Sequence, residues 1–278
     1  MARGEGLVIR LVVALPVEAK PLIAHFQLER AGEARGFEIY EKEGISLVVS
    51  GIGKTAAAAA TAYLQAWTGN QPNAAWINVG MAGHRDLLLG EGILGDRITD
   101  RATGEAWYPP PVIEAPCPRA PLMTVDRVEE AFAEEWVFEM EAAGFYPSAC
   151  RFASAELVQC YKIISDNASV PPRWLSRRQV DELIEARLPE IDAVVQETAR
   201  LAGELAASSK EPLEMQTLLN RWHFTSTERH RLHRLLQRWQ VLAPDRDLLD
   251  SELARRKTGK DVLGLIQARI ESLPVRLL

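Results

Sequence analysis

Short apolar runs recur over residues 7–165 and are separated by helical or turn-rich stretches. Runs of this length, rich in Val, Ile and Leu, are typical of strands buried on both faces of a sheet. The predicted strands are Leu7–Leu15, Phe37–Tyr40, Ile45–Ser50, Ala75–Val79, Ile93–Thr99, Leu122–Val125 and Tyr161–Ser165. The predicted helices among them and after them are Glu18–Phe26, Ala56–Trp67 and Arg177–Ala207. Strands interleaved with helices predict an α/β fold with a mixed or parallel sheet.

The pattern changes after residue 207. Residues 101–121 form a proline-rich irregular loop within the first part, and Ser208-Ser209-Lys210 with Pro212 forms a second break. Beyond that break the chain has only helical spacing, in Leu213–Trp222, Ser226–Trp239, Asp245–Arg256 and Asp261–Ser272. Thr225 or Ser226 is suited to cap the second of these helices, with Glu228 in its first turn. We therefore predict two domains, residues 1–207 and a small all-α appendage over residues 208–278.

Composition narrows the class of protein. The chain has 278 residues, of which 47% are hydrophobic and 25% charged, as expected of a soluble globular protein. A net charge of -6 argues against a chain devoted to nucleic acid but leaves room for a local basic patch. No apolar run approaches the roughly 20 residues that cross a bilayer. The three cysteines have neither pairing nor metal-ligand spacing, which predicts a cytoplasmic protein. We expect the chain to use no metal and no cofactor.

Polar or glycine-rich residues follow four predicted strands. Ligands of open α/β sheets bind beyond the carboxyl ends of strands, so these residues are candidates for one site. They are Glu18, the string Gly51-Ile52-Gly53-Lys54, the string Gly80-Met81-Ala82-Gly83, and Asp166. Each also has a structural explanation: Glu18 as a first-turn carboxylate, the two glycine strings as tight turns, and Asp166 as a cap.

The segment Glu139-Met140-Glu141 carries two carboxylates. If the segment is extended, both point to one face, since side chains alternate along a strand. Two like charges there require a cation, a hydrogen-bond donor or a polyol ligand if they are buried. A solvated sheet edge would tolerate them equally well.

Taken together, these strings resemble a known family. They run in order over residues 7–205 as Ala14-Leu15-Pro16-Val17-Glu18-Ala19, Ser50-Gly51-Ile52-Gly53-Lys54, Asn78-Val79-Gly80-Met81-Ala82-Gly83, Gly95-Asp96, Phe138-Glu139-Met140-Glu141-Ala142-Ala143 and Ile164-Ser165-Asp166. The chain resembles the nucleoside phosphorylase/nucleosidase superfamily and is most similar to the methylthioadenosine/S-adenosylhomocysteine nucleosidases. The resemblance implies a three-layer phosphorylase-like fold, with a central mixed sheet flanked by helices, and a homodimer.

The resemblance also implies roles for single residues. Glu18 matches the carboxylate that deprotonates the attacking water, and Asp166 matches the acid that protonates the purine. Glu141 matches the carboxylate that binds the ribose hydroxyls. The remaining matches are substrate-binding positions: Leu15, Ile52, Gly80, Val128, Glu139, Met140 and Ser165. These roles imply hydrolysis of the N-glycosidic bond of a purine nucleoside, in which an acid at the base and carboxylates near the sugar stabilise opposite ends of one transition state.

The chain departs from the family between Asp100 and Glu139, where its middle section is shorter. Val128 stands where the family has an aromatic residue that stacks on the base, and Trp107, Tyr108 or Trp136 are possible substitutes. The identity of the base therefore stays open at this stage.

Two alternatives to the hydrolase remain. Lys54 and Arg85 are compatible with a phosphate-dependent phosphorylase, although Glu18 would repel a phosphate ion. The second alternative is a diverged nucleoside-binding protein whose basic C-terminal helices contact nucleic acid or a partner. Residues 221–239 are rich in Arg and His with flanking Trp. The competing interpretation is a solvated helix face, packed through Leu232, Leu235 and Leu236.

Overall fold

The computed structural model describes residues 8–32, 35–69, 71, 73–170, 175–209, 212–243 and 246–273. They fall into two compact units, Met1–Leu205 and Ala206–Leu278. Among the helices of the described residues, none combines the length and the apolar character of a membrane span.

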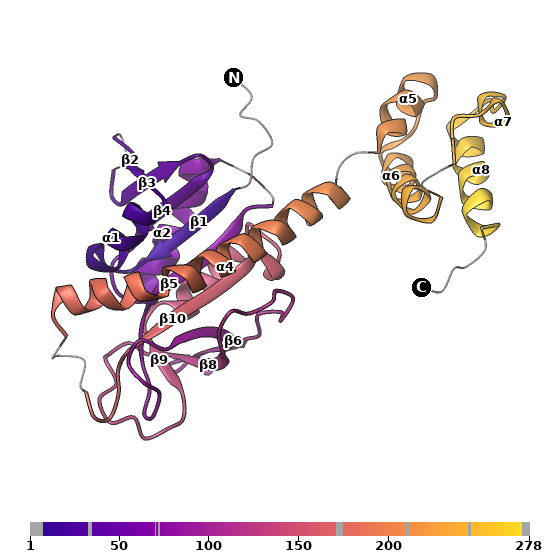
Figure 1. Cartoon of the computed structure of the whole chain (residues 1–278). Helices are drawn as coiled ribbons and strands as arrows, with labels where there is room; N and C mark the ends of the chain where they lie inside the picture. The colour runs from indigo at the N-terminus through magenta and orange to yellow at the C-terminus, as the bar shows by residue number, and fades with distance from the viewer. Residues whose placement is uncertain are drawn as a thin grey trace. The chain divides into compact units, whose positions relative to one another are not determined.

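The first unit is built on one mixed sheet (Figure 1). Its strands lie in the order β10-β6-β8-β9-β5-β1-β4-β3-β2, with β7 beside β6. Their bounds are β1 Ile9–Val13, β2 Glu29–Arg30, β3 Glu38–Lys42, β4 Ile45–Val49, β5 Ala75–Gly83, β6 Gly92–Asp100, β7 Ala106–Trp107, β8 Arg119–Thr124, β9 Val137–Glu139 and β10 Val158–Asp166. Because β5 pairs with both β10 and β9, the strands β5, β10, β6, β8 and β9 close into a ring.

Four strands at the centre of the sheet are parallel. β1 pairs in parallel with β4 and with β5, and β5 pairs in parallel with β10. Val13 lies level with Val49 and Val79, and Asp166 lies level with Gly83. The expectation that these four strands open toward one edge is therefore confirmed, and that edge is where the candidate site residues begin.

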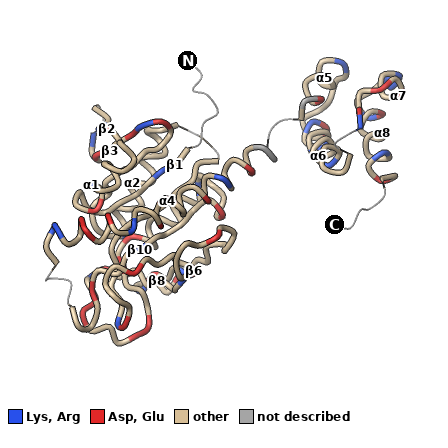
Figure 2. The backbone as a smooth tube through the Cα atoms, viewed as in Figure 1, with Lys and Arg blue, Asp and Glu red and all other residues tan. Residues whose placement is uncertain are grey.

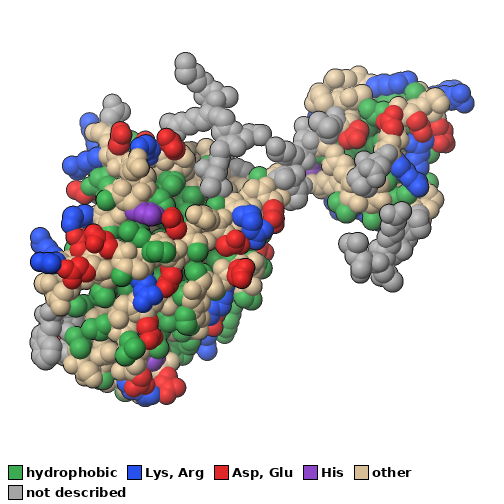
Figure 3. Space-filling model, viewed as in Figure 1, with side chains coloured by type: hydrophobic (Ala, Val, Ile, Leu, Met, Phe, Trp, Pro, Cys, Tyr) green, Lys and Arg blue, Asp and Glu red, His purple; other side chains and the backbone are tan. Residues whose placement is uncertain are grey.

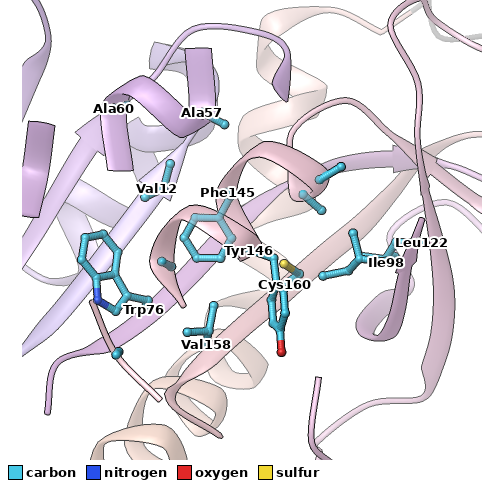
Figure 4. Close-up of a cluster of buried hydrophobic side chains, with 14 of the residues drawn as sticks. Val12, Ala57, Ala60, Trp76, Ile98, Leu122, Phe145, Tyr146, Val158 and Cys160 are labelled. Atoms are coloured by element: carbon cyan, nitrogen blue, oxygen red, sulfur yellow. The ribbon is translucent and has the colours of Figure 1, made fainter. Parts of the chain in front are cut away.

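Helices cover both faces of the sheet and complete three layers. On one face, α2 (Lys54–Thr68) and α3 (Ala142–Ala149) contribute side chains to a core around Trp76 and Phe145 (Figure 4). On the other face, α1 (Pro16–His25) and α4 (Arg177–Ser209) pack a second core through residues such as Leu22 and Ile191. The predicted three-layer α/β architecture with a mixed sheet is confirmed.

Two predicted boundaries are wrong. Gly80–Gly83 is not a turn but the last part of β5, which stays paired with β10 to its end. The helix predicted over Asp245–Arg256 is reduced to α7 (Ser251–Ala254), and residue 245 lies outside the described part of the chain. The side chain of Asp250 accepts a hydrogen bond from the backbone N–H of Leu253, which makes Asp250 the cap where this helix begins.

The second unit consists of helices around its own core. Besides α7, they are α5 (Leu213–Arg221), α6 (Ser226–Leu242) and α8 (Gly259–Glu271). The apolar face of α6, with Leu232, Leu236 and Trp239, belongs to the same buried cluster as Val262 and Ile266 of α8. Thr225 caps α6 in a reciprocal arrangement with Glu228, as its position in the sequence predicts.

Gly144 tests how tightly α2 and α3 pack. A Cβ atom at this position would lie 1.8 Å from the backbone oxygen of Lys54. A backbone atom cannot move aside as the end of a flexible side chain can. Gly144→Ala is therefore expected to lower the free energy of unfolding by about 1–3 kcal/mol, the usual cost of overpacking. Urea denaturation measures the change.

Gly203→Ala is the matched control. Gly203 lies in α4, and a Cβ there meets no atom within 4 Å. Because alanine favours helix more than glycine does, this variant is expected to gain roughly 0.5–1 kcal/mol. Equal stability of the two variants would contradict the close packing of α3 on α2.

Candidate active site

A cavity of about 240 Å³ opens at the carboxyl edge of the parallel strands. All the residues to which the resemblance gives a catalytic or substrate-binding role line it, with the exception of Gly80: Leu15, Glu18, Ile52, Val128, Glu139, Met140, Glu141, Ser165 and Asp166. Ile52 and Val128 are each 56% exposed and lie at its rim. Gly80 lies behind the wall, where a Cβ would be 3.4 Å from Nζ of Lys162.

Glu18 is buried in the first turn of α1. Its Oε2 accepts a hydrogen bond from the backbone N–H of Leu15 at 2.9 Å, and its Oε1 accepts one from the backbone N–H of Met81 at 3.1 Å. Burial raises the pKa of Glu18 to about 7, with a further contribution from the charge of Glu141, despite the opposing backbone hydrogen bonds. At neutral pH this carboxyl group is close to half ionised, which is the condition suited to a general base.

Glu139 and Glu141 share one buried cation. Nζ of Lys162 lies 2.8 Å from Oε2 of Glu139 and 3.5 Å from Oε2 of Glu141, and the Lys162 side chain is fully buried. Burial alone would raise the pKa of Glu139, but the charge and hydrogen bond of Lys162, helped by the hydroxyl of Thr124, hold it below its usual value. Glu139 is therefore a permanent anion at neutral pH.

The pKa of Glu141 moves the other way. Burial raises it, and the charge of Glu139 adds to the rise, while Lys162 opposes both. Oε1 of Glu141 also accepts a hydrogen bond from the backbone N–H of Gly53 at 3.0 Å. Glu141 follows β9 and stands at the start of α3, so its carboxylate reaches the cavity from a turn and not from an extended strand.

Lys162 is a charged residue of the candidate site that the sequence analysis did not single out. It is the only charged residue in β10 before the terminal aspartate, within Val158-Gln159-Cys160-Tyr161-Lys162-Ile163-Ile164. A lone lysine inside an otherwise buried strand is a usable signal, because a buried ammonium group requires an anionic partner. Of the cation, hydrogen-bond donor or polyol ligand that a buried Glu139–Glu141 pair calls for, the structure supplies the cation, Lys162.

Asp166 ends β10, level with Gly83 of β5, and lines the same cavity. Burial raises the pKa of Asp166, and the hydrogen bond that its Oδ1 accepts from the hydroxyl of Ser165 offsets part of the rise. Gly83 leaves room for this side chain, since a Cβ there would lie 2.4 Å from Oδ2 of Asp166 and 2.8 Å from the ring of Phe132. The carboxyl group is thus confined between a strand backbone and an aromatic ring, where it retains a proton more readily than in water.

An aromatic ring does line the cavity, but not one of the three suggested by the sequence. Phe138, in β9, is 4% exposed and faces the cavity, whereas Trp107, Tyr108 and Trp136 are absent from its lining. The guanidinium group of Arg97 lies instead over the rings of Tyr108 and Trp136. Phe138 belongs to the same string as the carboxylates on either side of Met140, but the sequence pattern indicates a role only for the carboxylates.

The string Gly51-Ile52-Gly53-Lys54 is the tight turn between β4 and α2. Gly51 and Gly53 have φ angles of 84° and 100°, which non-glycine residues rarely adopt. Lys54 is not free to meet an anion, because its Nζ lies 2.9 Å from Asp100 and 3.0 Å from Asp126. The turn contributes backbone N–H groups and the rim residue Ile52 to the cavity.

Arg85 is likewise engaged, at 2.8 Å from Asp86 and 2.6 Å from Glu135. Among the described residues that line the cavity, none is a lysine or an arginine. Within the same described part of the chain, no cluster of His, Cys, Asp and Glu has the arrangement of a metal site.

No protein-family model and no curated protein sequence matches the chain. Its fold is nevertheless similar to solved structures. The methylthioadenosine/S-adenosylhomocysteine nucleosidase of Colwellia psychrerythraea, solved with adenine, is 17% identical over 70% of this chain and 96% of its own, with a TM-score of 0.54. The corresponding nucleosidase of S. pneumoniae is 18% identical over 69% of this chain and 99% of its own, with a TM-score of 0.54.

Futalosine hydrolase of Helicobacter pylori is 15% identical over 70% of this chain and 100% of its own, with a TM-score of 0.55. Each of these proteins is covered almost completely, so the likeness extends over a whole domain. The first unit of this chain therefore has the phosphorylase-like fold that these nucleosidases and futalosine hydrolase share.

Proposed function

We propose that the first unit hydrolyses the N-glycosidic bond of a purine nucleoside similar to methylthioadenosine or adenosylhomocysteine. One observation carries the proposal. Two buried carboxyl groups with raised pKa values, Glu18 and Asp166, line one cavity together with the carboxylates of Glu139 and Glu141. Groups able to act as acid and base in one cavity, together with anions, fit a reaction in which the sugar becomes positive and the base leaves with an electron pair.

In the proposed reaction, Glu18 accepts a proton from water while the water oxygen forms a bond to the anomeric carbon. The carbon–nitrogen bond breaks, and its electron pair moves to the departing base. Asp166 donates its proton to N7 of that base, and Ser165 orients the Asp166 carboxyl group. The products are the free base and the sugar with a hydroxyl group at the anomeric carbon, so atoms and charge balance.

Glu141 is proposed to accept hydrogen bonds from the ribose hydroxyls, with Met140 beneath the sugar. Lys162 and Glu139 are proposed to act on Glu141 indirectly, because the positive charge of Lys162 and the negative charge of Glu139 lie beside it. Leu15, Ile52 and Val128 line the apolar part of the cavity and are proposed to contact the substrate there. Phe138, which lines the same cavity as Asp166, is proposed as the aromatic face for the base, in the role that Val128 cannot fill.

Water is favoured over phosphate as the nucleophile. Glu18 would repel a phosphate dianion, and Lys54 and Arg85 are both engaged with carboxylates. The fold also includes hydrolases by name, the nucleosidases and futalosine hydrolase. A homodimer and a cytoplasmic location remain part of the proposal. The resemblance supports the homodimer, and the free thiols of Cys117, Cys150 and Cys160 support the cytoplasmic location.

The direct test measures release of adenine from methylthioadenosine by the purified chain. Glu18→Gln and Asp166→Asn are each expected to lower turnover by about 10²–10⁴-fold, because each removes one proton transfer. Glu204→Gln, at an exposed ion pair of α4, is the control and should leave turnover unchanged. Base release is expected in phosphate-free buffer, and a strict requirement for phosphate would replace the hydrolase with the phosphorylase.

The raised pKa of Glu18 predicts a pH-dependent stability. Its folded value of about 7 exceeds the ordinary value of 4.5, so the native state holds the proton more tightly. This contribution is complete below pH 4.5 and is lost as pH rises to about 7. From about pH 5 to about pH 8, the wild type is expected to lose about 2 kcal/mol relative to Glu18→Gln, which has no such proton. Parallel urea titrations of the two proteins would give a constant difference if Glu18 had an ordinary pKa.

Lys162→Met tests the buried ion cluster. It leaves Glu139 and Glu141 buried without a cation, which costs about 3–5 kcal/mol of unfolding free energy for buried pairs in general. The double variant Lys162→Met/Glu139→Gln removes one of the two orphaned charges and should recover part of the loss. Arg200→Met, which breaks an exposed pair of α4, should change little. Chemical denaturation that found Lys162→Met as stable as Arg200→Met would refute the cluster.

A further inference from the structure

The two units differ in charge. Residues 206–278 hold 13 Lys and Arg against 9 Asp and Glu, a formal charge of +4, whereas the whole chain carries -6. Figure 3 shows Lys and Arg side chains gathered along the outer edge of the second unit, next to α5 and α7, and Figure 2 shows the positions of these residues along the backbone. A positive module on an otherwise acidic chain points to an anionic partner for that module alone.

The first two helices of this unit form a helix-turn-helix. α5 ends at Arg221, α6 begins at Ser226, and the four residues 222–225 connect them. The connection is ordered: the backbone N–H of Trp222 donates to the oxygen of Leu218, and Thr225 caps α6. A turn of three to four residues followed by a longer helix is the arrangement with which many proteins place a helix in the major groove of DNA.

α6 has an apolar face on one side and a basic face on the other. Its apolar face is buried against α8, so it cannot insert into a lipid surface. On the other side, His230, Arg234 and Arg238 follow one another at intervals of four residues and are exposed. From His230 to Arg238 the helix rises by about 12 Å, close to the roughly 12 Å width of the major groove.

The cations of this face are available. Arg229, Arg234 and Arg238 form no ion pair with any residue in the described ranges. Glu228, the nearest acid on α6, is engaged with Thr225 at the cap. An unneutralised row of arginines is unfavourable by itself and is relieved by phosphate groups.

A second basic group lies at the start of α6. The guanidinium group of Arg221 donates to the oxygen of Ala254 at 2.7 Å, and the indole N–H of Trp222 donates to the oxygen of Arg256 at 2.9 Å. These bonds bring the connection between α5 and α6 beside the segment 255–260, in which Arg255, Lys257 and Lys260 are exposed. Arg255, Lys257 and Lys260 thus form a second exposed basic group near the start of α6, and such cations suit phosphate contacts.

From this juxtaposition we infer that the second unit binds duplex DNA, with α6 in the major groove and the 255–260 segment on the phosphate backbone. An acidic protein partner fits less well, because protein interfaces have an apolar centre and the exposed face of α6 between His230 and Arg238 has none. The inference goes beyond the proposed nucleosidase and does not depend on it.

The test measures fluorescence anisotropy of a labelled duplex of about 25 base pairs with the full chain, over about 50 to 200 mM salt. Binding is expected to weaken linearly on logarithmic axes. Arg234→Ala/Arg238→Ala should reduce the slope by about 2 and weaken binding at least tenfold at the lowest salt. Arg178→Ala/Arg200→Ala removes the same charge from exposed positions of α4 and should leave both quantities unchanged.

Three results would overturn the inference: no binding of the duplex at the lowest salt, an equal loss in the two double variants, or binding of polyglutamate or single-stranded RNA as tight as that of the duplex. Unchanged thermal unfolding of Arg234→Ala/Arg238→Ala separates lost contacts from lost structure. Adenine release by the same preparations serves as an independent readout, so failure of the DNA inference and failure of the proposed hydrolase are distinguishable.

Discussion

The ammonium group of Lys162, buried between Glu139 and Glu141, is the interaction on which the arrangement of the cavity depends. It joins the middle of β10 to the end of β9 and the start of α3, so it links two strands of the ring and the helix that follows one of them. Separating Lys162 from its carboxylates would leave buried charges without partners, which costs several kcal/mol. This cost holds the segments together more than the energy gained on contact does. The position of each carboxylate is therefore tied to the closure of the sheet.

The same cation divides the acidic side chains of the cavity into two kinds. Glu139, which bonds directly to Lys162, has a lowered pKa, whereas Glu141, Glu18 and Asp166 have raised pKa values because burial dominates. Backbone N–H groups of Leu15 and Met81 stabilise the ionised form of Glu18 enough to leave its pKa near 7. One cavity thus contains a fixed anion and groups able to exchange protons, which is what separate acid, base and sugar-binding roles require.

Much of this was predictable from the sequence. The apolar runs located the strands of the central sheet, and the residues that follow them located Glu18 and Asp166, because buried strands must be apolar and ligand-binding groups must come after them. Gly80–Gly83 shows the limit. The glycines there suggest a turn, but the segment is strand, and Gly83 is needed because Asp166 and Phe132 crowd the strand from the side.

The sequence by itself determined the kinds of element, the three-layer class and most of the residues that line the cavity, since these depend on local periodicity and on short strings. Only the tertiary structure decided which strands are neighbours. The parallel register of β10 with β5 places Lys162 level with Gly80, and the short pairing of β9 brings Phe138 level with Gly83. Lys162 and Phe138 do not stand out in their apolar and acidic strings, because their positions in the site depend on partners distant in sequence. The closure of the ring, which no local pattern encodes, sets those distances.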